Sequence, residues 1–476
     1  MIKKNARIAA LIMAVLMLSS AAAGCKKNPD DSSSDSYVSE LTPEDVSSTS
    51  DNESQADENN SSADASAASA SSKKENSSNK TNSSKNSSGG TSSGKTTTST
   101  VKYATWENIG TSEYGPVVKK FTAETKIKVK IVSVPQETYE EKISAMIAAG
   151  NSPDVIKDQN RFPYTLANAQ PITNGGVNPN DSRWDPVQTN ISTVNGKTYY
   201  VTSKQPIFQC RYLLYYNKKL FTANGINSPE DYVKANNWNL ETFKKAAQEI
   251  KAATGLECGA YLDFESFPSC YRGQFFKLNN GKFSSGVLDD SMRNIVTYML
   301  DGSKGGYFKL GNRLNGGDFV DGKNPMVIMD TFGLKANGYF KAMKDSDLGF
   351  TYLPKENASD ADYPSAGWSG GVGIAKGSKN VEGAGKFINY VFDMDKFEYS
   401  DIYKNDASKN FHIEITSRAL DSNRVAFFGP HLNKLSPITA NLLNTDSSQV
   451  VANLSKVQNV VTDMVNKANA EIDKNK

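Results

Sequence analysis

The polar, low-complexity stretch from Lys26 to about Thr100 most constrains what this chain can fold into. It consists mainly of Ser, Asn, Thr, Lys, Asp and Glu, with almost no large apolar side chain. Such a segment cannot bury enough apolar surface to offset the entropy lost on ordering, so we expect a flexible tether. The fold must therefore come from residues 101–476, which carry nearly all the aromatic residues and are long enough for two lobes.

The chain begins as a secretory signal does. A basic start is followed by an apolar run from Ile8 to Leu18 and by small residues up to Cys25. The run is too short for a membrane-spanning helix and is typical of a signal peptide. Small residues directly before a cysteine resemble the bacterial lipobox, which implies that Cys25 is lipidated; the alternative is an ordinary cleaved signal. The expected domains are a signal (1–24), a lipidated Cys with its tether (25–100) and a folded domain (101–476).

Charge and side-chain chemistry exclude several classes of function. The 54 Lys and Arg and 52 Asp and Glu residues give a net charge of only +2, so the sequence has no nucleic-acid footprint. Neither of the two His residues lies in a metal-ligand pattern, so we expect no metal and no cofactor. Cys258 could pair with Cys270 across a short loop and leave Cys210 buried, but the spacing does not decide this.

The folded part alternates strand and helix patterns. Lys126 to Val134 alternates apolar and charged residues as a half-exposed strand does, and Tyr139 to Ala149 has helical spacing that Gly150 ends. Asp154 to Ile156 then reads as a short buried strand, which predicts a parallel strand–helix–strand unit. The stretch from Gln449 predicts a long amphipathic helix. Together these patterns predict α/β layers.

One motif raises the possibility of an enzyme. Residues 367–371 match the G-x-S-x-G pattern around Ser369, and His412 and His431 follow in the chain. A nucleophile elbow needs an apolar strand before the serine and a helix after it. Here the preceding flank is polar and the following flank reads as a strand. A secreted serine hydrolase therefore remains a minor alternative.

Aromatic residues at strand ends point instead to binding. Trp106 and Glu107 follow the first predicted strand, Phe332 follows the strand that ends at Asp330, and Trp368 precedes another strand. Open α/β sheets bind ligands at the carboxyl ends of their strands. There, an aromatic face can stack on the apolar side of a sugar while carboxylates and amides bind its hydroxyls.

A series of motifs resembles the family 1 extracellular solute-binding proteins, the group that includes maltose-binding protein. The motifs occur in the family's order and cover most of the folded region. The first is a helix, the run A-G-x-x-P-D-V and a strand, at Met146 to Val155. The others are Y-Y-N-K-x-L-F at Tyr215 to Phe221, followed by Gly225-Ile226 and Trp238 to Phe243, and then the segments Phe319 to Phe332 and Gly370 to Lys376.

The resemblance implies a two-lobed periplasmic-binding-protein-like fold (type II), with discontinuous lobes joined by a hinge. The first lobe would comprise about residues 101–210 and 360–412, and the second about 211–359 and 413–476. Carried over onto this sequence, the family's ligand contacts and the aromatic strand ends give one set of candidate binding residues: Trp106, Glu107, Asp158, Asn160, Arg161, Asp330, Phe332 and Trp368.

The implied function is capture without catalysis. We expect a monomeric, lipid-anchored receptor on the extracellular face of the bacterial cell membrane that delivers a sugar or oligosaccharide to the permease of an ABC importer. A non-sugar solute such as a peptide is the first alternative. The other two are a hydrolase that uses Ser369 and a surface adhesion or scaffold module on a long stalk.

Overall fold

A computed structural model describes most of the region after the tether. The described residues are 38–40, 100–109, 112, 114–158, 162, 164–264, 266–279, 281–311, 315–368, 370–393, 402–418, 439, 442 and 446–475. The chain divides into two units, residues 1–37 and 38–476, and all described residues belong to the second. The predictions for the signal, for Cys25 and for most of the tether lie outside the described residues.

The first sheet has seven strands in the order β1-β3-β2-β4-β17-β5, with β8 also pairing with β17. Strand β2 runs parallel to β3 and β4, whereas β17 is antiparallel to β4, β5 and β8. The parallel unit predicted from the sequence is therefore confirmed. The strands are β1 (Val38–Glu40), β2 (Thr100–Thr105), β3 (Lys128–Ser133), β4 (Val155–Asp158), β5 (Ala169–Gln170), β8 (Tyr200–Val201) and β17 (Gly371–Ala375).

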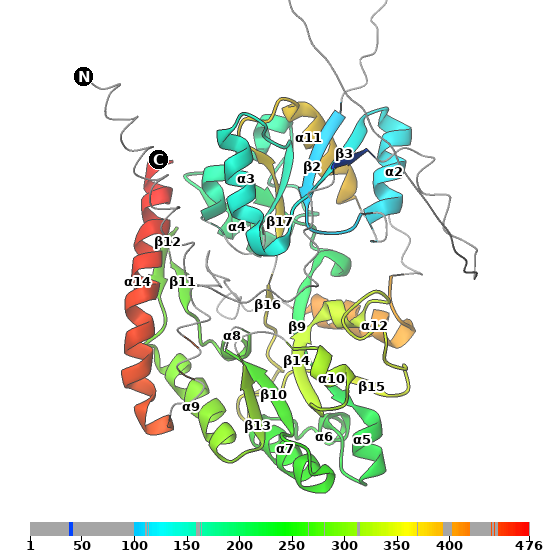
Figure 1. The fold of residues 1–476 in the computed structure, drawn as a ribbon, viewed down its shortest axis with the longest axis vertical. Coiled ribbons are helices and arrows are strands. Elements are labelled where there is room, and N and C mark those ends of the chain that lie inside the picture. The colour runs from blue at the N-terminus through cyan, green and yellow to red at the C-terminus, as the bar shows by residue number, and fades with distance from the viewer. Residues whose placement is uncertain are drawn as a thin grey trace, which may run out of the picture. The chain divides into compact units, whose positions relative to one another are not determined.

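Helices cover both faces of this sheet (Figure 1). Helices α2 (Tyr114–Thr125) and α11 (Val381–Val391) share a core with one set of strand side chains. Helices α3 (Tyr139–Ala148) and α4 (Pro186–Ile191) belong to the core that contains the strand side chains of the opposite face. Gly150, with a φ of 73°, follows the end of α3 as expected, because this left-handed conformation suits glycine.

The second sheet is mixed. Its order is β13-β10-β14-β9-β15, and β16 also pairs with β9. Strand β10 is parallel to β13 and β14, whereas β14, β15 and β16 are antiparallel to β9. The strands are β9 (Cys210–Asn217), β10 (Ala260–Asp263), β13 (Phe308–Gly311), β14 (Met326–Asp330), β15 (Leu348–Thr351) and β16 (Gly367–Trp368).

Local capping explains the helices beside this sheet. In α6 (Pro229–Lys234), the Ser228 hydroxyl accepts from the Asp231 amide while the Asp231 carboxylate accepts from the Ser228 amide. The Asn239 side chain caps α7 (Leu240–Thr254) in the same reciprocal way with Thr242. The inner face of α7, formed by Phe243, Ala247 and Ile250, is fully buried.

The chain crosses between the sheets more than once. It leaves β8 of the first sheet and enters β9 of the second, and it later passes from β16 on the second sheet to β17 on the first (Figure 1). The first sheet is thus built from two separate segments of the chain, whereas the strands of the second all lie between β9 and β16. Two sheets, each packed with helices, confirm the predicted two-lobed α/β class. The exact lobe boundaries stay a prediction.

The predicted C-terminal helix is α14 (Val450–Lys474), and it contacts elements from both parts of the fold. Its apolar stripe packs on helix α9 (Asp290–Lys304), on β12 (Lys282–Ser285) and on the short 3-10 helix η2 (Tyr164–Asn168). The Asn469 amide accepts from the Phe283 N–H at 2.8 Å and donates to the Phe283 carbonyl at 2.9 Å. Within the described residues, no helix combines the length and apolar character needed to cross a bilayer.

The cysteines after Cys25 are all thiols. Among the described residues no disulfide forms, so the possible Cys258–Cys270 pairing is not present. The Cys258 thiol lies 3.3 Å from Asn324 Oδ1, and the Cys270 thiol lies 3.3 Å from the Ser266 carbonyl. The thiols of Cys258 and Cys270 therefore have separate hydrogen-bonding partners.

Candidate ligand-binding site

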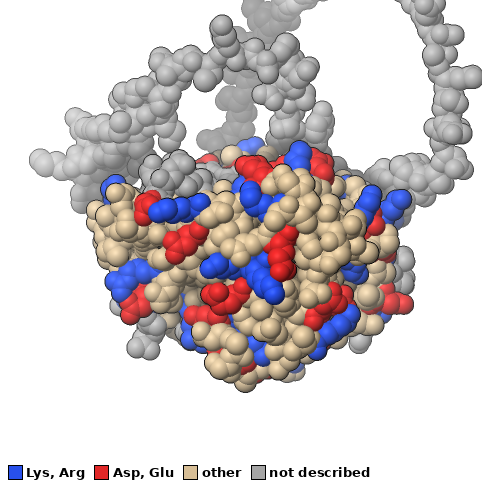
Figure 2. All heavy atoms as spheres, turned by 90° about the horizontal axis from the view of Figure 1, so that it is seen from below, with Lys and Arg blue, Asp and Glu red and all other residues tan. Residues whose placement is uncertain are grey.

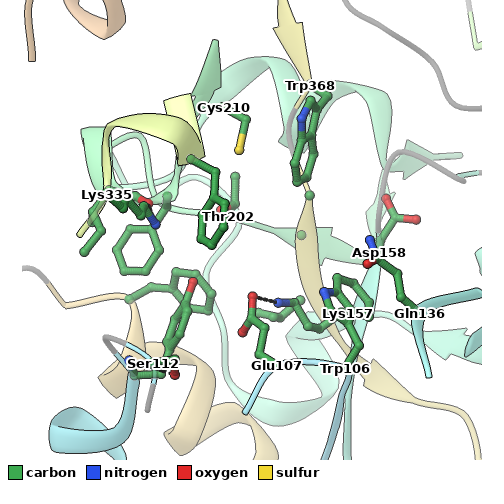
Figure 3. Close-up of a pocket in the computed structure, with 18 of the residues that line it drawn as sticks. Trp106, Glu107, Ser112, Gln136, Lys157, Asp158, Thr202, Cys210, Lys335 and Trp368 are labelled. Carbon is green, nitrogen blue, oxygen red and sulfur yellow. Dashed lines mark hydrogen bonds and ion pairs between the residues drawn. The ribbon is translucent and has the colours of Figure 1, made fainter. Parts of the chain in front are cut away.

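A cavity of about 390 Å³ is lined by side chains from both sheets (Figure 3). The first sheet contributes the loop after β2, the end of β4 and the start of β17. The second sheet contributes the first residue of β9, the segment after β14 and the end of β16. The lining residues are Tyr103, Trp106, Glu107, Asn108, Ser112, Tyr114, Gln136, Lys157, Asp158, Thr202, Ile207, Phe208, Cys210, Phe332, Lys335, Asn337, Tyr339, Trp368, Gly370, Gly371, Val372 and Phe392.

Most of the candidate residues from the sequence meet at this cavity. Five of them line it: Trp106, Glu107, Asp158, Phe332 and Trp368. Asp330 lies behind the lining and accepts hydrogen bonds from residues that line the cavity. The remaining candidates, Asn160 and Arg161, lie outside the described residues, as do Ser369 and His431.

An ion pair lies at the first-sheet side of the cavity. Lys157 Nζ lies 2.6 Å from Glu107 Oε1, and 4.4 Å from the centre of the Trp106 ring (Figure 3). The Trp106 ring also packs edge-on against Tyr139, with 5.0 Å between ring centres. Glu107 Oε2 is buried and has no hydrogen-bond partner among the described residues. The lysine ammonium therefore lies between a carboxylate and an aromatic face.

A buried carboxylate organises the aromatic side chains contributed by the second sheet. Asp330 accepts hydrogen bonds from the Phe332 amide at 2.9 Å, from Trp368 Nε1 at 3.1 Å and from the Tyr339 hydroxyl at 3.3 Å. Burial raises the pKa of the Asp330 carboxyl, and these three hydrogen bonds oppose the rise. Asp330 thus acts as a positioning residue for three residues that line the cavity.

The carboxylate of Asp158 faces protein partners. The residue is 1% exposed, and its Oδ1 accepts from the Thr165 hydroxyl at 3.0 Å. Its Oδ2 lies 3.5 Å from Gln188 Nε2. Asp158 lines the cavity, but these bonds occupy its carboxylate, so a direct ligand contact by Asp158 stays a prediction.

Several lining residues were missed by the sequence reasoning. Lys335, Asn337 and Tyr339 follow β14, as Phe332 does, so the rule that ligands bind at strand ends could have included them if applied to the whole loop. Lys157 lies beside the candidate Asp158 at the end of β4, but no local pattern indicated its contacts with Glu107 and Trp106, which lie about 50 residues earlier in the chain.

The surroundings of His412 do not suit a hydrolase. Its Nδ1 lies 3.0 Å from the Tyr403 hydroxyl and its Nε2 lies 3.1 Å from the Gln209 carbonyl. Burial, reinforced by the nearby charge of Lys335, lowers the pKa of His412 to about 3. The residues after Ser369 form the strand β17 rather than the helix of a nucleophile elbow. His412 is therefore already engaged, and the backbone is wrong for that chemistry.

The described side chains offer neither a metal site nor a reactive thiol. Within the described ranges, no group of three or more His, Cys, Asp or Glu side chains is placed to hold a metal ion. The Cys210 thiol lines the cavity, but burial, with the Asp330 charge second, raises its pKa far above the usual range. This thiol is therefore a poor nucleophile. The arrangement favours binding through aromatic faces and hydrogen bonds.

Two α/β lobes around a cavity of aromatic and polar side chains define a class of ligand-binding protein. The family model for bacterial extracellular solute-binding proteins matches residues 103–395, and the chain belongs to this family. The resemblance inferred from the motifs is thereby confirmed. Members of this family are binding proteins rather than enzymes, and they work with ABC importers.

Solved structures share the fold at low sequence identity. The GacH receptor of Streptomyces glaucescens GLA.O, solved unliganded and with acarbose, is 20% identical, with a TM-score of 0.58; the match covers 76% of this chain and 98% of that chain. UgpB from Mycobacterium tuberculosis, solved with glycerophosphocholine, is 17% identical (TM-score 0.57; 76% and 98% covered). The sugar-binding protein MalE from Xanthomonas citri is 15% identical (TM-score 0.55; 78% and 98% covered). No curated protein matches the chain.

Proposed function

We propose that this protein captures a sugar or short oligosaccharide outside the cell and delivers it to the permease of an ABC importer. The observation that carries the proposal is the cavity, in which aromatic rings alternate with hydroxyl, amide and carboxylate groups. Rings such as Trp368 and Phe332 present apolar faces to the C–H side of a sugar, while Gln136 and Asn337 offer hydrogen bonds to its hydroxyls. Structural neighbours bound to acarbose and described as sugar-binding add support.

The size of the cavity favours a short ligand. Its 390 Å³ lies near the lower end of the range of about 300–1,000 Å³ for small-molecule sites. A long polymer would need an open groove, so we favour a solute-binding role over an adhesion module.

Capture would work by closure of the lobes. Because both sheets contribute contacts, a ligand that touches both stabilises the closed arrangement by its greater affinity for it. The permease would then recognise the closed form. No chemical step is required.

The proposal places the protein on the extracellular face of the membrane, anchored as a monomer by a lipid on Cys25. Substitution Cys25→Ala should release the protein into the medium. Persistent membrane attachment of that variant would contradict the anchor.

Isothermal titration calorimetry of the mature protein against a panel of mono- and oligosaccharides tests the ligand class. We expect saturable binding of at least one sugar, which Trp368→Ala weakens. A response to peptides or phosphodiesters alone would contradict the sugar assignment and leave the transport role standing.

A non-sugar polar solute is the second candidate, and Lys335 in the cavity lining is the observation that favours it. An ammonium in the cavity could bind an anionic group, and the neighbour UgpB was solved with a glycerophosphodiester. Glycerophosphocholine and simple phosphodiesters therefore belong in the same titration panel.

A further inference from the structure

The ammonium of Lys157 occupies a position in which proteins also bind free cations. It lies 4.4 Å from the ring centre of Trp106, 5.9 Å from that of Tyr114 and 2.6 Å from Glu107 Oε1. Aromatic faces within about 6 Å combined with a carboxylate are the groups that recognise quaternary and alkylammonium ligands. We call the group formed by Trp106, Tyr114 and Glu107 the cation cage.

We propose that Lys157 is a specificity-determining residue: it fills a cation cage in the binding cavity with the protein's own ammonium and thereby excludes cationic solutes. The inference rests on the proposed function only in treating this cavity as the solute site. It narrows the solute class to ligands that do not carry a positive charge at this end of the cavity.

The geometry of the pair supports a filled cage rather than a surface salt bridge. The side chain of Lys157 is only 12% exposed and that of Glu107 is 29% exposed, so solvent screens their attraction less than at an open surface. Glu107 and Trp106 come from the loop after β2, whereas Lys157 comes from β4, so the fold itself brings the lysine to the cage. Figure 3 shows the Lys157 side chain alongside Trp106 and directed at Glu107.

The remaining groups of the cage explain why an empty cage would bind a cation. Within the part of the chain that the structure describes, Glu107 Oε2 is buried without a hydrogen-bond partner, and Lys157 is the neighbour that balances this carboxylate. Removing the lysine would leave a carboxylate beside two aromatic faces. A small organic cation would then regain both the ion pair and the cation–π contact.

Tetramethylammonium chloride is the probe, titrated by calorimetry against sodium chloride at equal ionic strength. Lys157→Ala empties the cage, Lys157→Met removes the charge but keeps the bulk, and Lys142→Ala removes an exposed lysine on α3 as the matched control. We expect Lys157→Ala to bind the probe at least about tenfold more tightly than the wild type does, as expected for a cation–π contact plus an ion pair. The Lys157→Met and Lys142→Ala variants should not gain this affinity, and adding Trp106→Ala to Lys157→Ala should abolish it.

Equal affinity of the wild type and Lys157→Ala for the probe would overturn the proposal, as would a gain in Lys157→Met equal to that in Lys157→Ala. If Lys157→Ala does not melt cooperatively, NMR of the wild type decides the question. The ε-methylene protons of Lys157, assigned by their absence in Lys157→Arg, should be shifted upfield by the Trp106 ring. Unshifted protons would contradict a filled cage. None of these readouts uses a sugar, so failure of the sugar assignment would not be mistaken for failure of the cage.

Discussion

The indole Nε1 of Trp368 donates a hydrogen bond to Oδ2 of Asp330 at 3.1 Å. The bond joins the end of β16 to the end of β14, two strands that both pair with β9. It fixes the ring of a side chain that lines the cavity by means of a carboxylate that is 1% exposed. The position of the aromatic ring therefore depends on a residue behind the cavity lining.

The first prediction separates the ring of Trp368 from its hydrogen bond. Trp368→Ala should weaken sugar affinity by roughly tenfold to a hundredfold, because burial of a large aromatic ring against the ligand contributes about 1.5–3 kcal/mol. Trp368→Phe keeps a ring but loses the bond to Asp330, so we expect an intermediate loss. Calorimetry on both variants measures the difference; equal affinities for wild type and Trp368→Ala would remove Trp368 from the site.

The second prediction concerns Asp330. Asp330→Ala leaves the Trp368 indole N–H and the Tyr339 hydroxyl without their acceptor, which should lower the free energy of unfolding by about 1–3 kcal/mol and also weaken ligand binding. Chemical denaturation and calorimetry measure the two effects. Asp301→Ala, on the exposed side of α9, is the control and should change neither. A loss of stability without any change in affinity would argue against a positioning role.

The third prediction is a pH dependence from His412. Burial lowers the pKa of this imidazole from 6.5 to about 3, so the unfolded chain binds a proton at pH values where the folded protein does not. Stability from this group is fully present above about pH 6.5 and is lost as the pH falls toward 3. The loss should reach roughly 3 kcal/mol at pH 4.

Denaturation of the wild type and His412→Gln at pH 7 and pH 4 tests this. Glutamine retains a donor for the Gln209 carbonyl but does not titrate, so the variant should lose less stability between the two pH values than the wild type. An identical loss of stability in the wild type and in His412→Gln would show that the acid sensitivity comes from another group.

The fourth prediction concerns Asn469 on α14, whose amide bonds both backbone groups of Phe283. Asn469→Ala should lower the free energy of unfolding by about 1–3 kcal/mol, since a backbone donor and acceptor lose their partners. Asn466→Ala, one turn earlier on the exposed face, is the matched control. Thermal melting compares the two variants, and equal melting temperatures would show that these bonds contribute nothing.

Much of the fold could be predicted because local signals agree with it. The alternation at Lys126 to Val134, the cap at Ser228 and the apolar stripe of α14 each specify an element without reference to distant residues. The motif order then indicated the family. The rule that ligands bind at strand ends also correctly predicted that Trp106 and Phe332 lie at one cavity.

The details of the site could not be predicted because they depend on contacts between distant segments. The Lys157–Glu107 pair and the Asp330–Trp368 bond join residues 50 and 38 positions apart. No sequence pattern indicated that the Asp158 carboxylate accepts a hydrogen bond from Thr165 and lies near Gln188. Side-chain type at a strand end therefore predicts a place in the cavity, but not whether the polar atoms are available.

Small-angle X-ray scattering of the mature protein, freed of its lipid, tests lobe closure around a sugar most directly. The radius of gyration should decrease when the sugar that binds best in calorimetry is added, and Trp368→Ala should show no decrease at the same sugar concentration. A radius of gyration that is unchanged at saturating sugar would contradict capture by closure.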